Sequence, residues 1–322
     1  MSGIFGIVRP PDAPVAEAEL APMADALKHR GPDGVMVFGR DNIGLGHCML
    51  HSTPESLHEK LPLRVGASGL TITADARIDN RKQLIADIPV NQANGQIITD
   101  SELILHAYSK WGKACVEKLL GDFVFAIWDE NRQCLFVARD HMGCKPFYYH
   151  HNRVQLVFAS SAVGVNAAHC VSTNINRGRV ADYLVEFLEG IDKTSTFFTD
   201  IYRLPPGHTL SYQAGEITTH CYWQPTLGTP IRYSRDEDYL EAFEEIFQQA
   251  VSARLRTHCR PAAMLSGGID SSVIAAIART QLQTAGTENL QTYTAFDDSI
   301  SDCKEAYHAR LLVSRGGFDS HE

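Results

Sequence analysis

Apolar residues in the first two thirds of the chain fall into short runs separated by turns, a pattern typical of strands with a few helices. The runs are rich in β-branched and aromatic residues, and two longer stretches with helical spacing predict helices at 15–28 and 101–119. The predicted strands are 4–8, 35–39, 43–50, 69–75, 123–128, 134–138, 146–149 and 155–160. This order of elements predicts a layered α+β domain.

The pattern changes after Glu216, where Thr, Pro and Gly residues predict a linker. A helix is then expected to begin at Ser234, which forms a capping box with Glu237. Apolar residues with helical spacing give this helix one face that we expect to pack in a core. These residues are Tyr239, Leu240, Phe243, Ile246, Phe247, Ala250, Val251 and Leu255.

The last part of the chain alternates between strand and helix patterns. A strand is predicted at 262–265, a helix from there to about residue 281, a second strand at 290–296 and a helix near 303–314. This order predicts a parallel α/β sheet, and ligands of such sheets bind at the carboxyl ends of the strands.

Length and composition fit this division. A chain of 322 residues with 44% apolar residues exceeds the usual size of one domain. The predicted parts are a first domain at 1–211, a linker at 212–233 and a second domain at 234–322. The formal net charge of −9, without any dense Lys/Arg run, argues against a nucleic-acid partner.

Neither the chain start nor any later apolar run has the length of a signal peptide or a membrane span, so no membrane partner is expected. The 8 cysteines lack both the spacing of metal ligands and the density of a secreted disulfide scaffold. They indicate reduced thiols in the cytoplasm. None of the 14 histidines has zinc-site spacing, so no metal site made by the protein alone is assigned.

The most specific stretch runs from Leu265 to Ser272, Leu-Ser-Gly-Gly-Ile-Asp-Ser-Ser, between the apolar strand and the helix. Gly267 and Gly268 let the backbone fold close to a ligand, and the free N–H groups of the helix bind anions. Ser266, Ser271 and Ser272 add hydroxyl donors. Asp270 either holds Mg²⁺ or orders the N–H groups of the loop. The alternative is an ordinary turn capped by Asp270, but this run between these elements favours a pyrophosphate-binding loop, and therefore ATP.

The loop resembles that of the ATP-pyrophosphatase domain of asparagine synthetases, and further motifs match in the order of that family. Met1–Val8 resembles the start of a class II glutamine amidotransferase domain, and the His-Arg-Gly-Pro-Asp run at 29–33 matches a motif of that domain. Further matches are Thr99–Glu102, Gly121–Asp129, Arg139–Tyr149 and Leu204–His208. The resemblance implies the four-layer αββα sandwich of N-terminal-nucleophile hydrolases, followed by the first part of a parallel α/β ATP-pyrophosphatase domain.

The resemblance also identifies a glutamine site in which several residues differ from the family pattern. The catalytic cysteine of the family, exposed when Met1 is removed, is replaced by Ser2, a far weaker acid than a thiol. Met49 stands where the family has the arginine that binds the glutamine carboxylate, and Asp75 replaces an oxyanion-hole asparagine. Asp100, which recognises the glutamine amine in the family, is kept. We expect no glutaminase activity; the alternative is a serine hydrolase that cuts another amide.

The resemblance implies an ATP- and Mg²⁺-dependent ligase that activates a carboxylate as an acyl-adenylate and releases pyrophosphate. Ile72–Asp79 is more similar to lasso-peptide cyclases, and the losses in the glutamine site resemble those of that branch and of β-lactam synthetases, in which the substrate supplies its own amine. Two alternatives remain: an asparagine synthetase that uses glutamine or ammonia, and a non-catalytic relative that binds nucleotide or a partner. The carboxylate and amine substrates stay open, including a precursor peptide.

The final residues, Asp319–Glu322, resemble the His-His-Glu segment inside the synthetase domain of the family. Two strands are too few for a doubly wound sheet, so the exposed edge is expected to need a partner. We therefore expect a fragment or one half of a split enzyme, completed by a C-terminal half or paired as a homodimer, with weak activity when alone.

Overall fold

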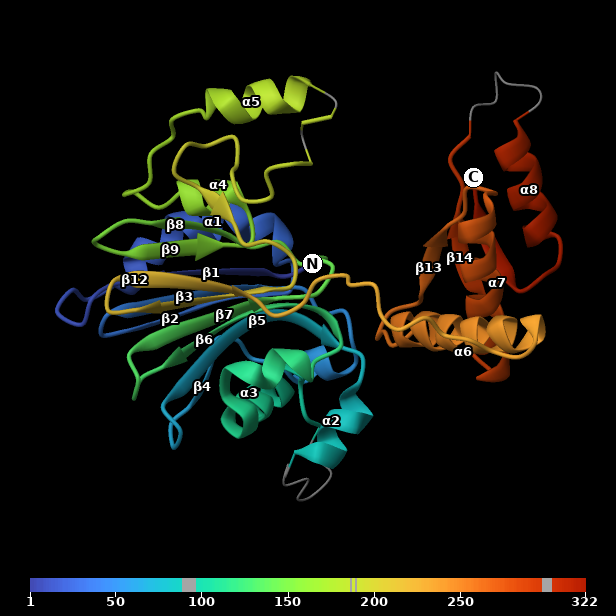
Figure 1. The fold of residues 1–322 in the computed structure, drawn as a ribbon, viewed down its shortest axis with the longest axis horizontal. Helices are drawn as coiled ribbons and strands as arrows, with labels where there is room; N and C mark the ends of the chain where they lie inside the picture. The colour runs from blue at the N-terminus through green and yellow to red at the C-terminus, as the bar shows by residue number, and fades with distance from the viewer. Residues whose placement is uncertain (89–96, 186, 189, 297–302) are drawn as a thin grey trace. The chain divides into compact units, whose positions relative to one another are not determined.

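The computed structural model describes residues 1–88, 97–185, 187–188, 190–296 and 303–322. The chain divides into two compact units, shown in Figure 1. The first unit contains Met1–His51 and Glu55–Thr226, and the second contains Ser52–Pro54 and Leu227–Glu322. None of the helices in the described parts of the chain is long and apolar enough to cross a membrane.

The first unit contains two antiparallel six-stranded sheets. The first sheet has the order β10 (Tyr202–Arg203), β8 (Tyr148–His151), β9 (Leu156–Ala159), β1 (Gly3–Val8), β3 (Ile43–Met49) and β2 (Gly34–Arg40). The second has the order β12 (Glu216–Cys221), β11 (His208–Gln213), β7 (Cys134–Arg139), β6 (Gly121–Asp129), β5 (Leu70–Ile78) and β4 (Leu63–Val65).

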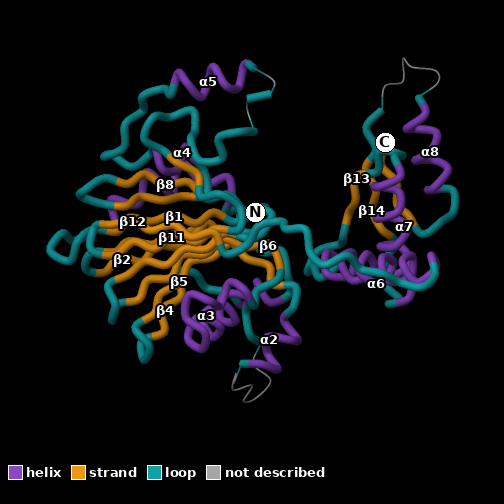
Figure 2. Tube along the Cα trace, in the orientation of Figure 1, coloured by secondary structure: helices purple, strands orange, loops and turns teal. Residues whose placement is uncertain are grey.

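Helices cover the outer face of each sheet, which gives the four layers in Figures 1 and 2. Over the first sheet lie α1 (Ala21–Leu27) and α4 (Ala162–Asn166), and against the second lie α2 (Arg81–Asp87) and α3 (Asp100–Trp111). The remaining helix of this unit is α5 (Arg177–Leu184). The short 3₁₀ helices are η1 (Glu17–Leu20), η2 (Lys28–Arg30), η3 (Glu55–His58) and η5 (Gly112–Glu117).

Three apolar clusters fill the spaces between these four layers. The strand β6 contributes to two of them, because successive side chains of a strand point to opposite faces. Phe123 and Phe125 pack on the α3 side, while Val124 and Trp128 pack between the two sheets. Both faces of this strand are therefore buried. The predicted α+β sandwich is confirmed.

The predicted elements of this unit correspond to real ones with two differences. The expected helix at 15–28 is divided into η1, α1 and η2, and Pro22 lies in the first turn of α1. The helix expected at 101–119 is α3 followed by η5, and the change occurs at Gly112, whose φ is 59°. A positive φ ends an α-helix and is favoured by glycine.

The region predicted as a linker, 212–233, contains a strand. β12 pairs with β11 in antiparallel register, and the turn between them contains Ala214 and Gly215, both with positive φ. Because β12 is an edge strand, most of its side chains are exposed, and only Ile217 is half-buried among them. Edge strands need no continuous apolar pattern, which explains why β12 could not be predicted from the sequence.

The second unit contains a parallel sheet in the order β13 (Ala262–Met264), β14 (Leu290–Tyr293) and β15 (Phe318–His321). Its helices are α6 (Asp236–Arg254), α7 (Ile269–Thr284) and α8 (Lys304–Val313). The sequence predicted two of the three strands and missed β15, in which only Phe318 is buried. A parallel α/β sheet with strand-helix-strand connections is confirmed for this unit.

The beginning and the apolar face of α6 differ from the expectation. The helix begins at Asp236 after Arg235, which makes no capping hydrogen bond, so the predicted Ser234–Glu237 capping box is wrong. Leu240, Phe243 and Ile246 are 68%, 66% and 68% exposed, so the predicted burial of this face is wrong for its first three turns. Among the described residues of the second unit, the core is a single apolar cluster that includes only the end of α6, where Val251 is buried.

Candidate functional site

The loop predicted to bind pyrophosphate lies between β13 and α7, at the carboxyl end of the parallel sheet. Gly267 has a φ of 76°, which favours glycine. A Cβ atom at this position would lie 2.1 Å from the backbone oxygen of Glu305. The loop therefore requires glycine here both for its conformation and for the close approach of α8.

Serine hydroxyls tie the loop to the first turn of α7. The Oγ atoms of Ser266 and Ser271 lie 3.0 Å apart. The backbone N–H of Gly268 donates to Oγ of Ser266, and Oγ of Ser271 donates to the backbone oxygen of Gly268, both at 3.3 Å. Ser272 donates its backbone N–H to the same oxygen at 3.1 Å. Ser266, Gly268, Ser271 and Ser272 thus form one hydrogen-bonded turn.

The amino terminus of α7 is open to an anion. Its N-cap residue is Gly268, which has no side chain to accept from the first N–H groups. Asp270 is exposed, and among the described residues its carboxylate has no hydrogen bond or ion pair. Asp270 therefore neither caps the helix nor orders the loop. Backbone N–H groups at such a terminus bind phosphate.

Ser2 lies at the amino end of β1 and is 6% exposed. Its Oγ accepts the backbone N–H of Leu50 at 3.0 Å and lies 3.3 Å from the backbone oxygen of the same residue. The hydroxyl is therefore held by the backbone after β3.

Asp75, in β5, is 5% exposed, and its Oδ1 lies 2.7 Å from Nζ of Lys145. Its other carboxylate oxygen is buried without a hydrogen-bond partner among the described residues. The position that would need N–H donors for an oxyanion thus carries a carboxylate already paired with a cation. No role for Lys145 was predicted from the sequence, although a buried carboxylate requires a partner and Lys145 lies in the recognised motif Arg139–Tyr149.

The charges around the chain start also include its amine. Burial lowers the pKa of the Met1 amine; the negative charge of Asp75 raises it, and the positive charges of Lys145 and Arg30 lower it. These groups therefore lie within electrostatic range of one another. The structure brings the chain start, Asp75 and two cations into the same region of the first unit.

The two other residues of the predicted glutamine site, Asp100 and Met49, have different surroundings. Asp100 is 3% exposed at the beginning of α3 and forms an ion pair with Arg81, which also donates to the backbone oxygen of Ile98. Met49 is 9% exposed and belongs to an apolar cluster. Asp100 is thus committed to an arginine that the sequence did not single out, and Met49 supplies no charge.

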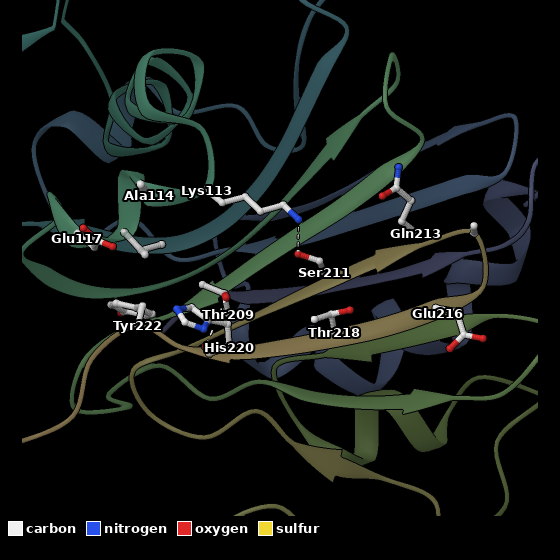
Figure 3. Close-up of a pocket in the computed structure, with 12 residues that line it drawn as sticks. Lys113, Ala114, Glu117, Thr209, Ser211, Gln213, Glu216, Thr218, His220 and Tyr222 are labelled. Atoms are coloured by element: carbon white, nitrogen blue, oxygen red, sulfur yellow. Dashed lines mark hydrogen bonds between the residues drawn. The ribbon is translucent and has the colours of Figure 1, made fainter.

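A groove of about 630 Å³ in the first unit lies along β11, β12 and η5, apart from the predicted glutamine site (Figure 3). Lys113 reaches across it and donates to Oγ of Ser211 at 2.9 Å. None of the residues predicted from the sequence lines this groove.

Among the described residues, no group of three or more His, Cys, Asp or Glu side chains could hold a metal ion.

The fold and these positions define a class of protein: an N-terminal-nucleophile amidotransferase fold joined to a parallel α/β unit with a glycine- and serine-rich loop after its first strand. Comparison with protein families agrees. A glutamine amidotransferase domain model matches residues 1–223, and an asparagine synthase model matches residues 242–322. The chain belongs to the asparagine synthetase family.

Curated relatives carry the same combination. The chain is 29% identical to asparagine synthetase [glutamine-hydrolyzing] 3 of Bacillus subtilis, covering 84% of this chain and 44% of the relative. It is 30% identical to a putative asparagine synthetase of Methanocaldococcus jannaschii, covering 87% and 57%, and 29% identical to amidase chry2 of Gibberella zeae, covering 96% and 47%. The chain spans about half the length of the curated relatives it matches.

Two solved structures share the fold. One is the glutamine phosphoribosylpyrophosphate amidotransferase of B. subtilis complexed with ADP and GMP, with a TM-score of 0.50 at 16% identity, covering 88% of this chain and 64% of that one. The other is an allosteric regulatory enzyme of purine biosynthesis, with a TM-score of 0.52 at 14% identity, covering 99% and 79%. At these identities the likeness concerns the fold alone.

Proposed function

We propose that this chain is part of an ATP-dependent amide-forming ligase that activates a carboxylate as an acyl-adenylate and releases pyrophosphate. The observation that carries the proposal is the open loop from Ser266 to Ser272 at the carboxyl edge of the parallel sheet. Ligands of such sheets bind at this edge, and the amino terminus of the following helix favours phosphate.

In this proposal, Ser266, Gly267, Gly268, Ser271 and Ser272 hold the phosphates through N–H and hydroxyl groups. Asp270 is exposed beside them without a partner among the described residues, which fits a carboxylate that faces the Mg²⁺ accompanying ATP. Mg²⁺ supplies charge neutralisation of the phosphates when it is bound. The chain itself contributes the orientation of the phosphates and the donors around them.

We further propose that the first unit hydrolyses no glutamine. Ser2 lacks the acidity of a thiol, and Met49 provides no positive charge for a carboxylate. At Asp75 the loss is electrostatic, because a carboxylate beside a developing oxyanion is repulsive even when Lys145 is paired with it. Removal of one oxyanion donor alone typically costs about 3 kcal/mol of transition-state stabilisation.

The nitrogen must then come from another amine. In the branch of the family that the glutamine-site losses resemble, the substrate supplies its own amine and closes a ring, as in lasso-peptide cyclases and β-lactam synthetases. A precursor peptide is a substrate of this kind. Under this proposal ATP, a carboxylate and an amine of the same molecule are the partners, and the enzyme acts in the cytoplasm.

A second candidate is asparagine synthesis with glutamine or ammonia. It is favoured by the names of the curated relatives and by Asp100, which is retained at the position that contacts glutamine in the family. The ion pair of Asp100 with Arg81 speaks against glutamine binding there, because the carboxylate is already neutralised. A non-catalytic relative is the third possibility, but it does not explain why the loop from Ser266 to Ser272 is open to an anion.

Binding of Mg²⁺-ATP tests the loop directly. We expect amide hydrogen exchange in residues 265–272 to slow when ATP is added, and Asp270→Asn to weaken the affinity about tenfold. Asp236→Asn is a matched control, because Asp236 lies in the first turn of α6 as Asp270 does in α7. Unchanged ATP affinity in both Asp270→Asn and Gly267→Ala would place the nucleotide elsewhere and refute the proposal.

Glutamine hydrolysis tests the first unit. The purified chain with glutamine should release no glutamate, and Ser2→Cys alone should not restore release, because Met49 and Asp75 remain. A variant that combines Ser2→Cys, Met49→Arg and Asp75→Asn measures whether these three positions account for the loss. Glutamate release by the unmodified chain at a rate that keeps pace with amide formation would overturn this part and favour asparagine synthesis.

A further inference from the structure

A cavity of about 470 Å³ in the first unit is distinct from the predicted sites. It lies between the ends of β7, β8 and β10 on one side and α5 and residues 190–193 on the other. Its lining contains four cationic side chains, Arg139, Arg179, Arg203 and Lys193. The only acidic side chain of the described lining is Asp192.

The carboxylate of Asp192 is already used within its own turn. Its Oδ1 accepts the backbone N–H of Thr194 at 2.7 Å, the hydroxyl of Thr194 at 2.9 Å and the backbone N–H of Ser195 at 3.0 Å. Hydrogen bonds from Ser195 and then Thr194 hold the pKa of Asp192 well below its usual range. Asp192 therefore shapes the loop, and within the described part of the chain it forms no ion pair with the arginines.

Two of the arginines are held by backbone groups rather than by carboxylates. Arg139 donates to the backbone oxygens of Lys145 at 2.7 Å, Leu204 at 2.5 Å and Gly143 at 2.7 Å. Burial lowers the pKa of Arg139, and the positive charge of Arg203 lowers it further, so the two guanidinium groups lie close enough to repel. Carbonyl groups fix the position of Arg139, and the negative charge of Asp140, which raises its pKa, offsets only part of the effect of burial.

Arg203 adds an unused donor. One of its terminal nitrogens donates to the backbone oxygen of Asp192 at 3.2 Å, while its Nε is buried without a hydrogen-bond partner among the described residues. A buried donor that is left unpaired costs free energy, and more so when it belongs to a charged group. A cation cluster with an unused buried donor in a cavity of this size fits an anionic ligand.

We propose that this cavity binds a phosphate-bearing small molecule. The cations come from separate segments of the chain and surround the cavity from different elements, which suits a phosphate group with acceptor oxygens in several directions better than a planar carboxylate. The volume exceeds that of a single phosphate, and Tyr148 and the buried Phe147 offer an aromatic wall for the rest of the molecule. The proposal is independent of catalysis in the second unit.

Hydrogen exchange of the full chain with pyrophosphate, ATP or citrate tests the proposal and locates the ligand. We expect pyrophosphate or ATP to slow exchange in residues 190–206, with an affinity that Arg203→Gln and Lys193→Gln each weaken about tenfold. Lys193 is exposed on a loop, so its replacement keeps the test valid if Arg203→Gln fails to fold. Arg132→Gln and Lys113→Gln are matched controls on other surfaces of the same unit and should change nothing.

The variant Asp270→Asn separates this cavity from the loop of the second unit, because protection of 190–206 should persist in it. Greater protection by ATP than by pyrophosphate would identify an organic phosphate, and equal protection an inorganic one; either supports the proposal. Protection limited to 265–272, no protection by either phosphate compound, or affinity unchanged in both cavity variants would overturn it. Citrate binding at least as tight as pyrophosphate would overturn the preference for phosphate.

Discussion

The two units of this chain bury their apolar residues to very different extents. The first places three apolar clusters between four layers, with fully buried aromatic residues such as Phe125 and Phe136. The second has one cluster, made largely of Ala, Val and Leu, while Phe243 on α6 and Met264 on β13 are 66% and 70% exposed. In the second unit, a small core is enough to hold the loop between β13 and α7 in place. The apolar side chains on α6 and β13 remain exposed.

Their charged groups differ in the same way. The first unit contains ion pairs with little solvent access, such as Lys145–Asp75, whose side chains are 13% and 6% exposed. In the second unit, Arg310–Glu322 is 55% and 37% exposed. Buried pairs become costly when one partner is removed, whereas exposed pairs contribute little. The two units should therefore respond differently to comparable substitutions.

The largest effect is expected for Phe125→Ala. Phe125 is fully buried beside Phe123 and Phe136, with ring centroids 5.7 and 6.1 Å away, so its loss should lower the free energy of unfolding of the first unit by about 3–5 kcal/mol. The tryptophans, at 111, 128 and 223, all lie in this unit, so their fluorescence during urea unfolding reports it alone. A loss below about 1 kcal/mol would mean that the core is looser than its packing indicates.

Nearly as large an effect is expected for Asp75→Ala. It leaves the ammonium of Lys145 without its partner at a largely buried position and should cost about 3 kcal/mol in the same measurement. The double variant Asp75→Ala/Lys145→Met removes the charge as well and should recover most of the loss. If the double variant is as unstable as the single one, the pair is not the reason for the cost.

A smaller effect concerns the pH dependence of the first unit. Burial lowers the pKa of His47 from 6.5 to about 3, so the unfolded state binds more protons between these values and stability falls as pH falls through this range. The contribution is up to about 1.4 kcal/mol per pH unit. His47→Gln should remove it, whereas His220→Gln, at an exposed position, should retain it. Equal slopes in the two variants would contradict this.

Titration of Glu59 changes the stability of the first unit in the opposite direction, and it therefore limits the pH range in which the effect of His47 can be measured. Burial, aided by the charges of Asp100 and Glu102, raises its pKa from 4.5 to about 7, so the folded state binds more protons and stability falls as pH rises from 4.5 to 7. The His47 effect should therefore be clearest between pH 3 and 4.5. In the variant Glu59→Gln, the pH range over which His47 changes the stability should extend up to pH 6.5.

The smallest effect is expected for Phe243→Ser in the second unit. Because the side chain is 66% exposed, the unfolding free energy should change by less than about 0.5 kcal/mol. Hydrogen exchange of α7 and β14, which form the core of that unit, measures this. A loss above about 2 kcal/mol would show that the face of α6 is covered in solution, and the contrast between the two units would then be smaller than the structure indicates.

The sequence predicted most interior strands and missed most strands at the sheet edges for a physical reason; the exceptions are the interior strand β11, which was missed, and the edge strands β2 and β13, which were predicted. A strand such as β6, buried on both faces, must be apolar at nearly every position, and this is visible locally. In β12, one face and one edge are open to water, so Thr and His are accepted and the segment resembled a linker. β4 and β10 are equally inconspicuous, because each is held by pairing with a neighbour rather than by its own pattern.

The candidate sites divide along the same line. The sequence predicted the turn from Ser266 to Ser272 between a strand and a helix, because its glycines and hydroxyls act through the local backbone; its role in binding phosphate stays a prediction. The partners of Asp75 and Asp100 could not be predicted in this way. Lys145 lies 70 positions from Asp75 and Arg81 lies 19 positions from Asp100, and only the packing of the chain brings each pair together.

By itself, then, the sequence determined the family, the sandwich with its following parallel sheet, and the turn between β13 and α7, since each depends on short-range patterns of apolar residues, glycines and hydroxyls. The tertiary structure decided which charges are paired, which strands close the sheet edges and that the apolar face of α6 is exposed. It also assembled the cavity of Arg139, Arg179, Lys193 and Arg203. These features depend on contacts between distant residues, which local patterns do not encode.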